Sequence, residues 1–316
     1  MPRFARRILA GLCLALAAAV PAGAQGAGVV ERNQTAFSPA LGRPLAYNLF
    51  RPAEPPAEGA RWPVIYLLEG RPSESDWLDQ GFVYEVIDRA VADGVIPPSL
   101  VVIPVAPFSW YVDNDDPGGQ GMMKTALTRD LVAAIDARFP TAACREGRAV
   151  GGLSMGGYGA VTFALADPGL YVGAMSFAGA ITPPIEAGDR ARLERADAFY
   201  DGAFGRPLER GRFNAWNPFV LLRSLPRKPG PKPAIFLAIG DRDRGGLLQS
   251  LTRFHVDLLR AGVDSTLRIG PGVHDWDTWR RQLADGLGWL GPRLDPGCRR
   301  DVANRPGDVP SESASP

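Results

Sequence analysis

The chain has little excess charge of either sign, few histidines and cysteines, and no apolar run that spans a bilayer comfortably. Of its 316 residues, 35 are basic and 34 are acidic. This balance argues against a nucleic-acid partner or an anionic-membrane partner, because both attract an excess of positive charge. The apolar run at residues 8–20 is shorter than the roughly 20 residues that a transmembrane helix needs. We therefore expect no stable membrane insertion.

The first two dozen residues have the pattern of an export signal. Arg3, Arg6 and Arg7 precede the apolar run, and the small residues Pro-Ala-Gly-Ala follow it and end at Ala24. This order is typical of a secretory signal peptide that is cleaved after Ala24, and an N-terminal membrane anchor is the alternative. We therefore predict a signal peptide over residues 1–24 and a periplasmic or secreted mature protein.

Cleavage after Ala24 leaves two cysteines, Cys144 and Cys298. In an oxidising compartment, an isolated pair invites a disulfide. Cys144 lies just before a predicted strand and Cys298 just after the last predicted helix, and in a doubly wound sheet these two positions share one rim. A bridge is feasible where the two Cα atoms lie within about 7 Å, and two free thiols are the alternative. Residues 299–316 are rich in proline, serine and aspartate and predict a disordered tail.

Between the leader and the tail, short apolar runs alternate with longer helical patterns, which predicts one α/β domain over residues 25–298. Its mostly parallel sheet should be flanked by crossover helices. The predicted strands are residues 64–68, 100–104, 149–152, 172–177, 234–239 and 265–269, with an edge hairpin over residues 28–51. Apolar stripes predict helices over residues 123–139, 156–166, 247–258 and 276–290. Residues 182–233 break the alternation, and an insertion of this length is more often a functional cap than an idle loop.

Residues 152–156 read Gly-Leu-Ser-Met-Gly, which fits the G-x-S-x-G spacing of a nucleophile elbow. The glycines on both sides of the serine let neighbouring backbone approach a strained strand-to-helix turn without Cβ clashes. A predicted strand comes before the motif and a helix rich in small residues follows it, which is the context this motif requires. The pattern predicts that Ser154 is a nucleophile in an α/β-hydrolase fold, and a tight glycine turn with an incidental serine is the alternative.

A serine hydroxyl needs a base within hydrogen-bond reach, and the chain offers two histidines. His255 lies inside an amphipathic helical pattern and is expected to be a partly buried helix residue. His274 follows a glycine-rich loop and precedes the last helix, so we predict that His274 is the base. The third member should follow a strand between serine and histidine. Asp243 lies three residues after Gly240, which matches the usual placement of this aspartate better than Asp241 does. Asp241 stays the alternative. The aspartate would hold the imidazole tautomer.

A tetrahedral intermediate needs backbone N–H donors as well as the three side chains. The residue after the nucleophile, Met155, supplies one amide, and Arg71, in the turn after the 64–68 strand, is the candidate for the other. A surface arginine without a backbone role is the alternative for Arg71. Trp110 and Tyr111 follow another strand at the same edge, so we expect them to wall the substrate pocket, with ordinary core packing as the alternative.

The acidic run Asp-Asn-Asp-Asp at residues 113–116 has a glycine where a calcium-binding EF-hand loop needs one. However, Pro117 and Lys124 occupy positions that should supply ligands. A solvated acidic turn is therefore the preferred interpretation. We expect neither a bound metal nor a cofactor.

The chain resembles the putative esterase family, which includes esterase D-like enzymes, feruloyl and enterochelin-type esterases, and the secreted mycolyltransferases of mycobacteria. The resemblance runs from about residue 29 to residue 290. It is carried by Tyr-Leu-Leu-Glu-Gly at 66–70, residues 152–157, Gly-Asp-Arg-Asp at 240–243, and Gly-Val-His-Asp-Trp at 272–276 with Trp279 and Arg280. Residues 108–113 are similar to a loop of the mycolyltransferase branch. Many relatives have His-Gly or Asp-Gly where this chain has Glu69-Gly70, and some mycolyltransferases use a glutamate as the third catalytic member.

The resemblance implies an α/β-hydrolase fold, acyl transfer from esters or thioesters, and the same three side chains and two amides. The leading hypothesis is an exported serine esterase that acts on small-molecule or glycoside esters through an acyl-enzyme. One alternative is an acyltransferase of the mycolyltransferase kind, which passes the acyl group to a sugar or alcohol. The other is a binding module without catalysis, although such proteins usually lose a member of the triad and this chain keeps candidates for all three.

Overall fold

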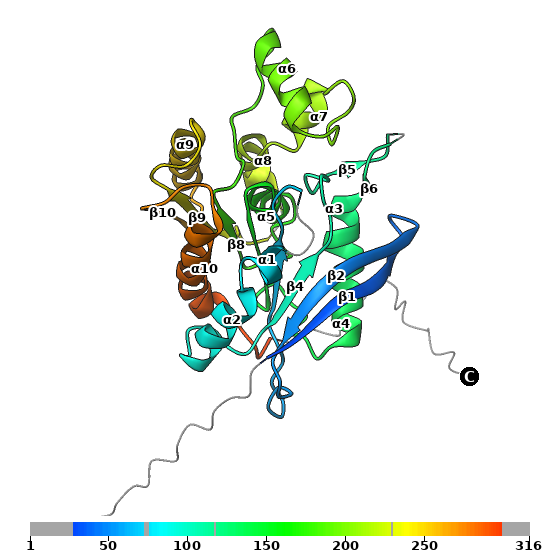
Figure 1. Ribbon diagram of the computed structural model, residues 1–316, viewed down its shortest axis with the longest axis vertical. Coiled ribbons are helices and arrows are strands. Elements are labelled where there is room, and N and C mark those ends of the chain that lie inside the picture. Colours follow the sequence, from blue (N-terminus) through cyan, green and yellow to red (C-terminus); the bar gives the residue numbers. More distant parts are fainter. Residues whose placement is uncertain (1–27, 73–75, 117, 229, 299–316) are drawn as a thin grey trace, which may run out of the picture.

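An eight-stranded sheet organises the chain, with the strand order β1-β2-β4-β3-β7-β8-β9-β10 (Figure 1). The structure is a computed structural model that describes residues 28–72, 76–116, 118–228 and 230–298. The predicted signal peptide and the predicted tail lie outside the described residues. The strands of the sheet are β1 (Val29–Ser38), β2 (Arg43–Arg51), β3 (Val64–Leu68), β4 (Leu100–Pro104), β7 (Arg148–Leu153), β8 (Gly173–Phe177), β9 (Ala234–Gly240) and β10 (Ser265–Gly270).

Six strands of the sheet run parallel, from β4 and β3 through β7, β8 and β9 to β10. The hairpin β1–β2 adds two antiparallel strands at one edge, as the alternating pattern predicted. Because parallel strands end at the same rim, the residues that follow β3, β4, β7, β8, β9 and β10 meet at one end of the molecule. The predicted fold class, a mostly parallel sheet with flanking helices, is confirmed.

The central strands are buried on both faces, which is why they appear in the sequence as continuous apolar runs. In β3, Val64, Tyr66 and Leu68 belong to one core and Ile65 and Leu67 to the other. The second core is covered by α1 (Asp76–Asp79), α2 (Val83–Ala92) and α10 (Trp276–Leu290). The first core is covered by α3 (Met123–Thr125), α4 (Val132–Arg138), α5 (Met155–Ala166), α8 (Pro218–Ser224) and α9 (Leu247–Arg260).

The helix predicted over residues 123–139 contains a π-helical segment, Ala126–Leu131, between α3 and α4. Its buried stripe repeats every four residues: Met123, Leu127, Leu131 and Ile135. A strict repeat of four drifts around an α-helix of 3.6 residues per turn. The wider π turn offsets part of this drift and keeps the stripe against the sheet.

The insertion predicted over residues 182–233 contains α6 (Arg190–Phe199), α7 (Arg210–Ala215) and α8. Figure 1 shows α6 and α7 beyond the end of the sheet, next to the small hairpin of β5 (Asp113–Asn114) and β6 (Gly121–Met122). Helix α8 instead packs on α5 and α9 in the core. The insertion therefore contributes α8 to the core, while α6 and α7 form an outer layer.

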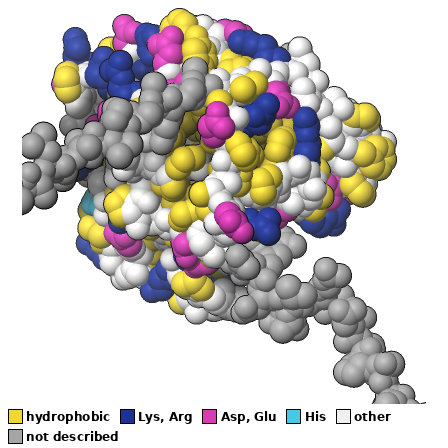
Figure 2. Space-filling view, turned by 90° about the horizontal axis from the view of Figure 1, so that it is seen from below, with side chains coloured by type: hydrophobic (Ala, Val, Ile, Leu, Met, Phe, Trp, Pro, Cys, Tyr) yellow, Lys and Arg dark blue, Asp and Glu magenta, His cyan; other side chains and the backbone are white. Residues whose placement is uncertain are grey.

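The opposite end of the molecule carries the disulfide. Cys144 and Cys298 are bridged, with their Cα atoms 6.2 Å apart, as the shared-rim argument predicted. Figure 2 views the molecule from this end, and basic, acidic and hydrophobic side chains are interspersed over its described surface. Within the ranges given above, every helix is too short or too polar to cross a bilayer.

Candidate active site

Ser154 stands on a strained turn between β7 and α5. Its φ of 50° and ψ of −111° lie outside the regions that L-residues favour, and the surrounding packing holds this conformation. A Cβ on Gly152 would lie 2.5 Å from the carbonyl carbon of Gly156, and a Cβ on Gly156 would lie 2.3 Å from the carbonyl oxygen of Leu68. Both glycines of the motif are therefore required by contact with backbone that cannot move aside.

The structure brings the three predicted side chains together. His274 Nε2 lies 3.1 Å from Ser154 Oγ, and His274 Nδ1 lies 2.9 Å and 3.2 Å from the two carboxylate oxygens of Asp243. The Asp243 side chain is fully buried, and 11% of the His274 side chain is exposed. An imidazole that donates Nδ1–H to this carboxylate presents Nε2 as an acceptor for the serine hydroxyl. The ring of Trp279 packs perpendicular to the imidazole, with 4.9 Å between the ring centroids.

Asp241, the alternative for the third member, has a different partner. Its Oδ1 accepts the backbone N–H of Gly272, two residues before His274, and this bond lowers the pKa of the Asp241 carboxyl. On the other side of the histidine, Asp275 caps α10 by accepting the amide of Thr278, which lowers the pKa of Asp275. The two aspartates fix both ends of the loop that carries the imidazole.

The two predicted oxyanion amides make no hydrogen bond to the described chain. Met155 is the first residue of α5, so its N–H has no acceptor within the helix. The N–H of Arg71 likewise has no acceptor in the described ranges. Arg71 is more than a surface arginine, because its Nε forms an ion pair with Asp201 of the insertion at 2.8 Å.

Glu69 is a functional-site residue whose role the sequence did not reveal. Its side chain is buried, and Oε1 accepts the N–H of Trp77, while the Trp77 indole donates to the carbonyl of Leu68. The phenol of Tyr111 donates to the carbonyl of Glu69 at 2.9 Å. These bonds brace the turn that leads to Arg71. The only sequence signal was the departure at this position from the His-Gly or Asp-Gly of many relatives.

The prediction that Tyr111 walls the pocket is wrong. Its ring is fully buried against Gly159 and Phe163, and burial raises the pKa of the phenol well above its usual value. Tyr111 therefore stabilises the turn from behind and is out of reach of a substrate. Its neighbour Trp110 does line the cavity over Ser154.

This cavity has a volume of about 210 Å³ and contains Ser154 and His274 in its wall. The lining also includes four aromatic residues, which are Trp110, Phe199, Trp276 and Trp279. Phe199 is the last residue of α6, so the insertion contributes directly to the cavity, as its interpretation as a cap requires. Two arginines, Arg71 and Arg244, and one acid, Asp76, add charge to the lining.

The interpretation of residues 113–116 as a solvated acidic turn holds for the exposed Asp115 and misses the contacts of its neighbours. Asp113 accepts the amide and hydroxyl of Thr125, and Asn114 is buried with its amide donating to the carbonyl of Gly202. Asp116 forms an ion pair with Arg212 of α7. The turn therefore anchors the insertion through Asn114 and Asp116 while Asp115 faces water. Among the described residues, no cluster of histidine, cysteine or carboxylate side chains is arranged to hold a metal ion.

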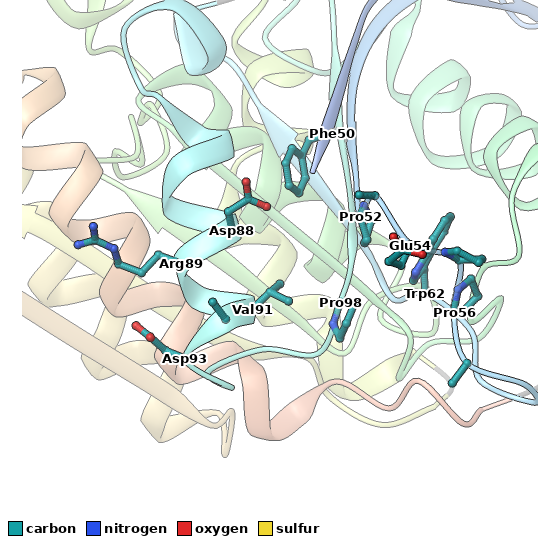
Figure 3. Close-up of a pocket in the computed structure, with 14 residues that line it drawn as sticks. Phe50, Pro52, Glu54, Pro56, Trp62, Asp88, Arg89, Val91, Asp93 and Pro98 are labelled. Carbon is teal, nitrogen blue, oxygen red and sulfur yellow. The ribbon is translucent and has the colours of Figure 1, made fainter. Parts of the chain in front are cut away.

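A larger cavity of about 690 Å³ lies near the opposite end of the sheet. Figure 3 shows Pro52, Glu54, Pro56 and Trp62 on one side and α2 with Asp88 on the other. Asp88 already accepts the N–H of Gly28. The lining of this cavity contains neither serine, cysteine nor histidine, so it lacks the side chains from which a serine-type or cysteine-type triad is built.

Comparison with known proteins shows the family to which the chain belongs. A family model described as "Putative esterase" matches residues 38–290. An acetyl esterase of Caldicellulosiruptor saccharolyticus is 26% identical over 236 residues, which cover 72% of this chain and 82% of that protein. An esterase of Mycobacterium tuberculosis is 27% identical over 265 residues, which cover 78% of this chain and 56% of that protein. The chain thus spans little more than half the length of the mycobacterial relative.

Solved structures share the fold. A ferulic acid esterase superposes with a TM-score of 0.65 at 24% identity and covers 85% of this chain and 99% of its own. A fluorophosphonate-binding serine hydrolase of Staphylococcus aureus gives a TM-score of 0.67 at 22% identity, with 85% and 100% covered. From the match over most of its length, the chain belongs to the putative esterase family of α/β-hydrolase-fold carboxylic ester hydrolases.

Proposed function

We propose that the chain is an exported serine esterase that hydrolyses esters of short acyl groups through an acyl-enzyme on Ser154. The observation that carries the proposal is the position of His274, whose two ring nitrogens contact Ser154 Oγ and the buried carboxylate of Asp243. This is the arrangement that a serine needs to act as a nucleophile at neutral pH.

The reaction follows from these contacts. Ser154 Oγ attacks the acyl carbon while His274 Nε2 accepts the hydroxyl proton. The carbonyl oxygen becomes an oxyanion that accepts hydrogen bonds from the amides of Arg71 and Met155, each worth about 3 kcal/mol in the transition state. The imidazolium then gives its proton to the departing alcohol. Water, deprotonated by the same imidazole, attacks the acyl-enzyme and releases the acid. Asp243 stabilises the imidazolium in both steps without taking up the proton.

The size of the cavity supports short acyl groups. About 210 Å³ lies below the roughly 300–1,000 Å³ of ordinary small-molecule sites. Aromatic side chains form part of the lining and can pack on a flat or compact acyl group. The curated relative from Caldicellulosiruptor saccharolyticus is an acetyl esterase, which agrees with this choice.

Steady-state kinetics and covalent labelling test the proposal. The mature chain should hydrolyse p-nitrophenyl acetate and butyrate at least about tenfold faster, in kcat/KM, than the octanoate. A fluorophosphonate should modify Ser154, located by mass spectrometry, and Ser154→Ala should lose labelling and turnover while keeping its circular dichroism spectrum. Unchanged turnover in Ser154→Ala would refute the proposal. Acyl transfer that outpaces hydrolysis when sugar or alcohol acceptors are added would favour the acyltransferase alternative.

Export is supported by the basic, apolar and small-residue order of residues 1–24 and by the Cys144–Cys298 disulfide, since such bonds persist in oxidising compartments. Expression with the native leader in a bacterium should give a periplasmic or secreted protein that begins at Gln25. Leu14→Arg, which places a charge inside the apolar run, should hold the protein in the cytoplasm. A mature protein that still begins at Met1 would contradict the assignment.

A further inference from the structure

One carboxylate oxygen of the insertion contacts both sides of the cavity mouth. Asp201 Oδ2 lies 2.8 Å from the Nε of Arg71 and accepts the indole N–H of Trp110 at 3.2 Å. The Asp201 side chain is 18% exposed, and the residue has a left-handed φ of 55°. Aspartate tolerates this backbone region better than most side chains.

This contact bears on the turn that carries the Arg71 amide. Glu69, two residues before Arg71, is held by bonds to Tyr111 and Trp77. Gly70 comes next, and it has no side chain that could hold the backbone. The Arg71 N–H makes no bond to the described chain, so the anchored side chain of Arg71 is the next fixed point. An amide that points at a developing oxyanion contributes only while its direction is fixed.

We propose that Asp201 is a positioning residue, through which the insertion fixes the direction of the Arg71 amide for the transition state. The inference rests on the proposed function, because it assigns an oxyanion role to that amide. Asp201 contacts the cavity lining through Arg71 and Trp110, and of these only Arg71 carries an amide assigned to the oxyanion, so its contribution should affect the rate of acylation more than the binding of the ester.

The insertion has a second means of attachment that does not involve this ion pair. The ring of Tyr200 packs on Trp110 with 4.4 Å between centroids, and Tyr200, Phe204 and Phe213 pack on one another at 5.0–5.3 Å. These buried rings continue into the main core. Removal of the Asp201 charge should therefore leave the insertion folded and in place.

The test compares two isosteric changes in or beside the insertion. Asp201→Asn removes the charge and keeps an oxygen that can accept from Trp110. Asp116→Asn is the matched control, because it weakens the insertion's ion pair with Arg212 and touches neither Arg71 nor Trp110. We expect kcat on p-nitrophenyl acetate to fall about 10- to 100-fold in Asp201→Asn, with KM within about threefold, since loss of a whole oxyanion donor costs about 10²–10³. Asp116→Asn should keep both constants within about threefold.

Arg71→Gln tests the same contact from the other side and retains the backbone amide. Each of the two changes breaks the same ion pair between Arg71 and Asp201. The double variant Asp201→Asn/Arg71→Gln should therefore be no slower than the slower single variant, within about twofold. The rate of fluorophosphonate labelling should fall in parallel with kcat. Equal kinetics in Asp201→Asn and Asp116→Asn, or losses that multiply in the double variant, would overturn the inference. An active Ser154→Ala variant would instead defeat the proposed function itself.

Discussion

Ser154 Oγ and His274 Nε2 lie 3.1 Å apart although 120 positions separate the two residues in the chain. Ser154 follows a central strand, β7, whereas His274 follows β10 at the sheet edge. The histidine loop must therefore fold back over the end of β9. It does so at Gly240, where an added Cβ would lie 2.4 Å from the carbonyl oxygen of Gly272. Close backbone contact between these glycines brings the edge loop into reach of the elbow.

The choice between the two aspartates of the loop after β9 can be tested directly. Asp243→Asn should lower kcat by about 10³–10⁴, because the amide no longer stabilises the imidazolium or its tautomer. Asp241→Asn keeps an oxygen for the Gly272 amide and should stay within about fivefold of the parent. The measurement is p-nitrophenyl acetate turnover at saturating substrate. The reverse order of effects would transfer the role to Asp241.

Gly156→Ala should destabilise the fold by about 3 kcal/mol or more. Its Cβ would meet the backbone of Leu68 and Glu69 at 2.3–2.7 Å, and β3 cannot shift without disturbing the sheet. Gly169→Ala is the matched control, since an added Cβ there meets nothing within 4 Å, and it should change stability by no more than about 0.5 kcal/mol. Urea unfolding of both variants gives the comparison. A Gly156→Ala protein as stable as the control would show that the elbow can relax.

The disulfide should contribute stability without contributing to catalysis. Cys144 and Cys298 close a loop of 154 positions, so Cys144→Ser/Cys298→Ser should lose about 2–4 kcal/mol of unfolding free energy. The bridge lies at the rim opposite Ser154, and kcat should therefore stay within about twofold. Parent protein unfolded in urea with dithiothreitol should match the double variant. If reductant left the parent's unfolding midpoint unchanged, the bridge would be absent in solution.

His255 should make the fold less stable in acid. It lies on α9 as a partly buried residue, as its helical pattern predicted, with Nδ1 2.9 Å from Ser265 Oγ. Burial lowers its pKa below the ordinary value of 6.5, because the charged imidazole loses solvation. Below about pH 6.5 the unfolded chain therefore binds a proton that the folded chain does not, and stability falls until the pH passes the folded pKa.

The comparison variant for this effect is His255→Gln, which keeps a polar group beside Ser265 and does not titrate. The stability of the parent relative to His255→Gln should decline as the pH is lowered from 7.5 to 5.0. Unfolding free energies from urea titrations at several pH values give this difference. A difference that stays constant over the range would argue against the lowered pKa.

The sheet and the three catalytic candidates were predictable because their signals are local. Apolar runs marked β3, β4, β7, β8 and β9, since strands buried on both faces have no polar alternation. The elbow is encoded within five residues, and the scarcity of histidine left few candidates for the base. The order of serine, aspartate and histidine along the chain then left Asp241 and Asp243, and the position of Asp243 three residues after Gly240 favoured it.

The misjudged residues are those whose partners lie far away in the sequence. Tyr111 was assigned to the pocket from its place after a strand, but its partners are Glu69 and the glycine-rich face of α5. The ion pair of Asp116 was missed because its counter-ion, Arg212, lies 96 positions away. Asp201 carried no signal, since an isolated aspartate in an irregular insertion has no pattern. Such contacts depend on the assembled fold and on no local periodicity.

Helix α5 is enclosed along almost its whole length, because every residue from Met155 to Leu165 is buried. Evolutionary drift there is confined to changes that conserve shape. Phe199, by contrast, is 42% exposed and still lines the cavity over Ser154. New acyl preferences should therefore arise in the insertion, and a mutant library aimed at altered selectivity would be best placed around Phe199.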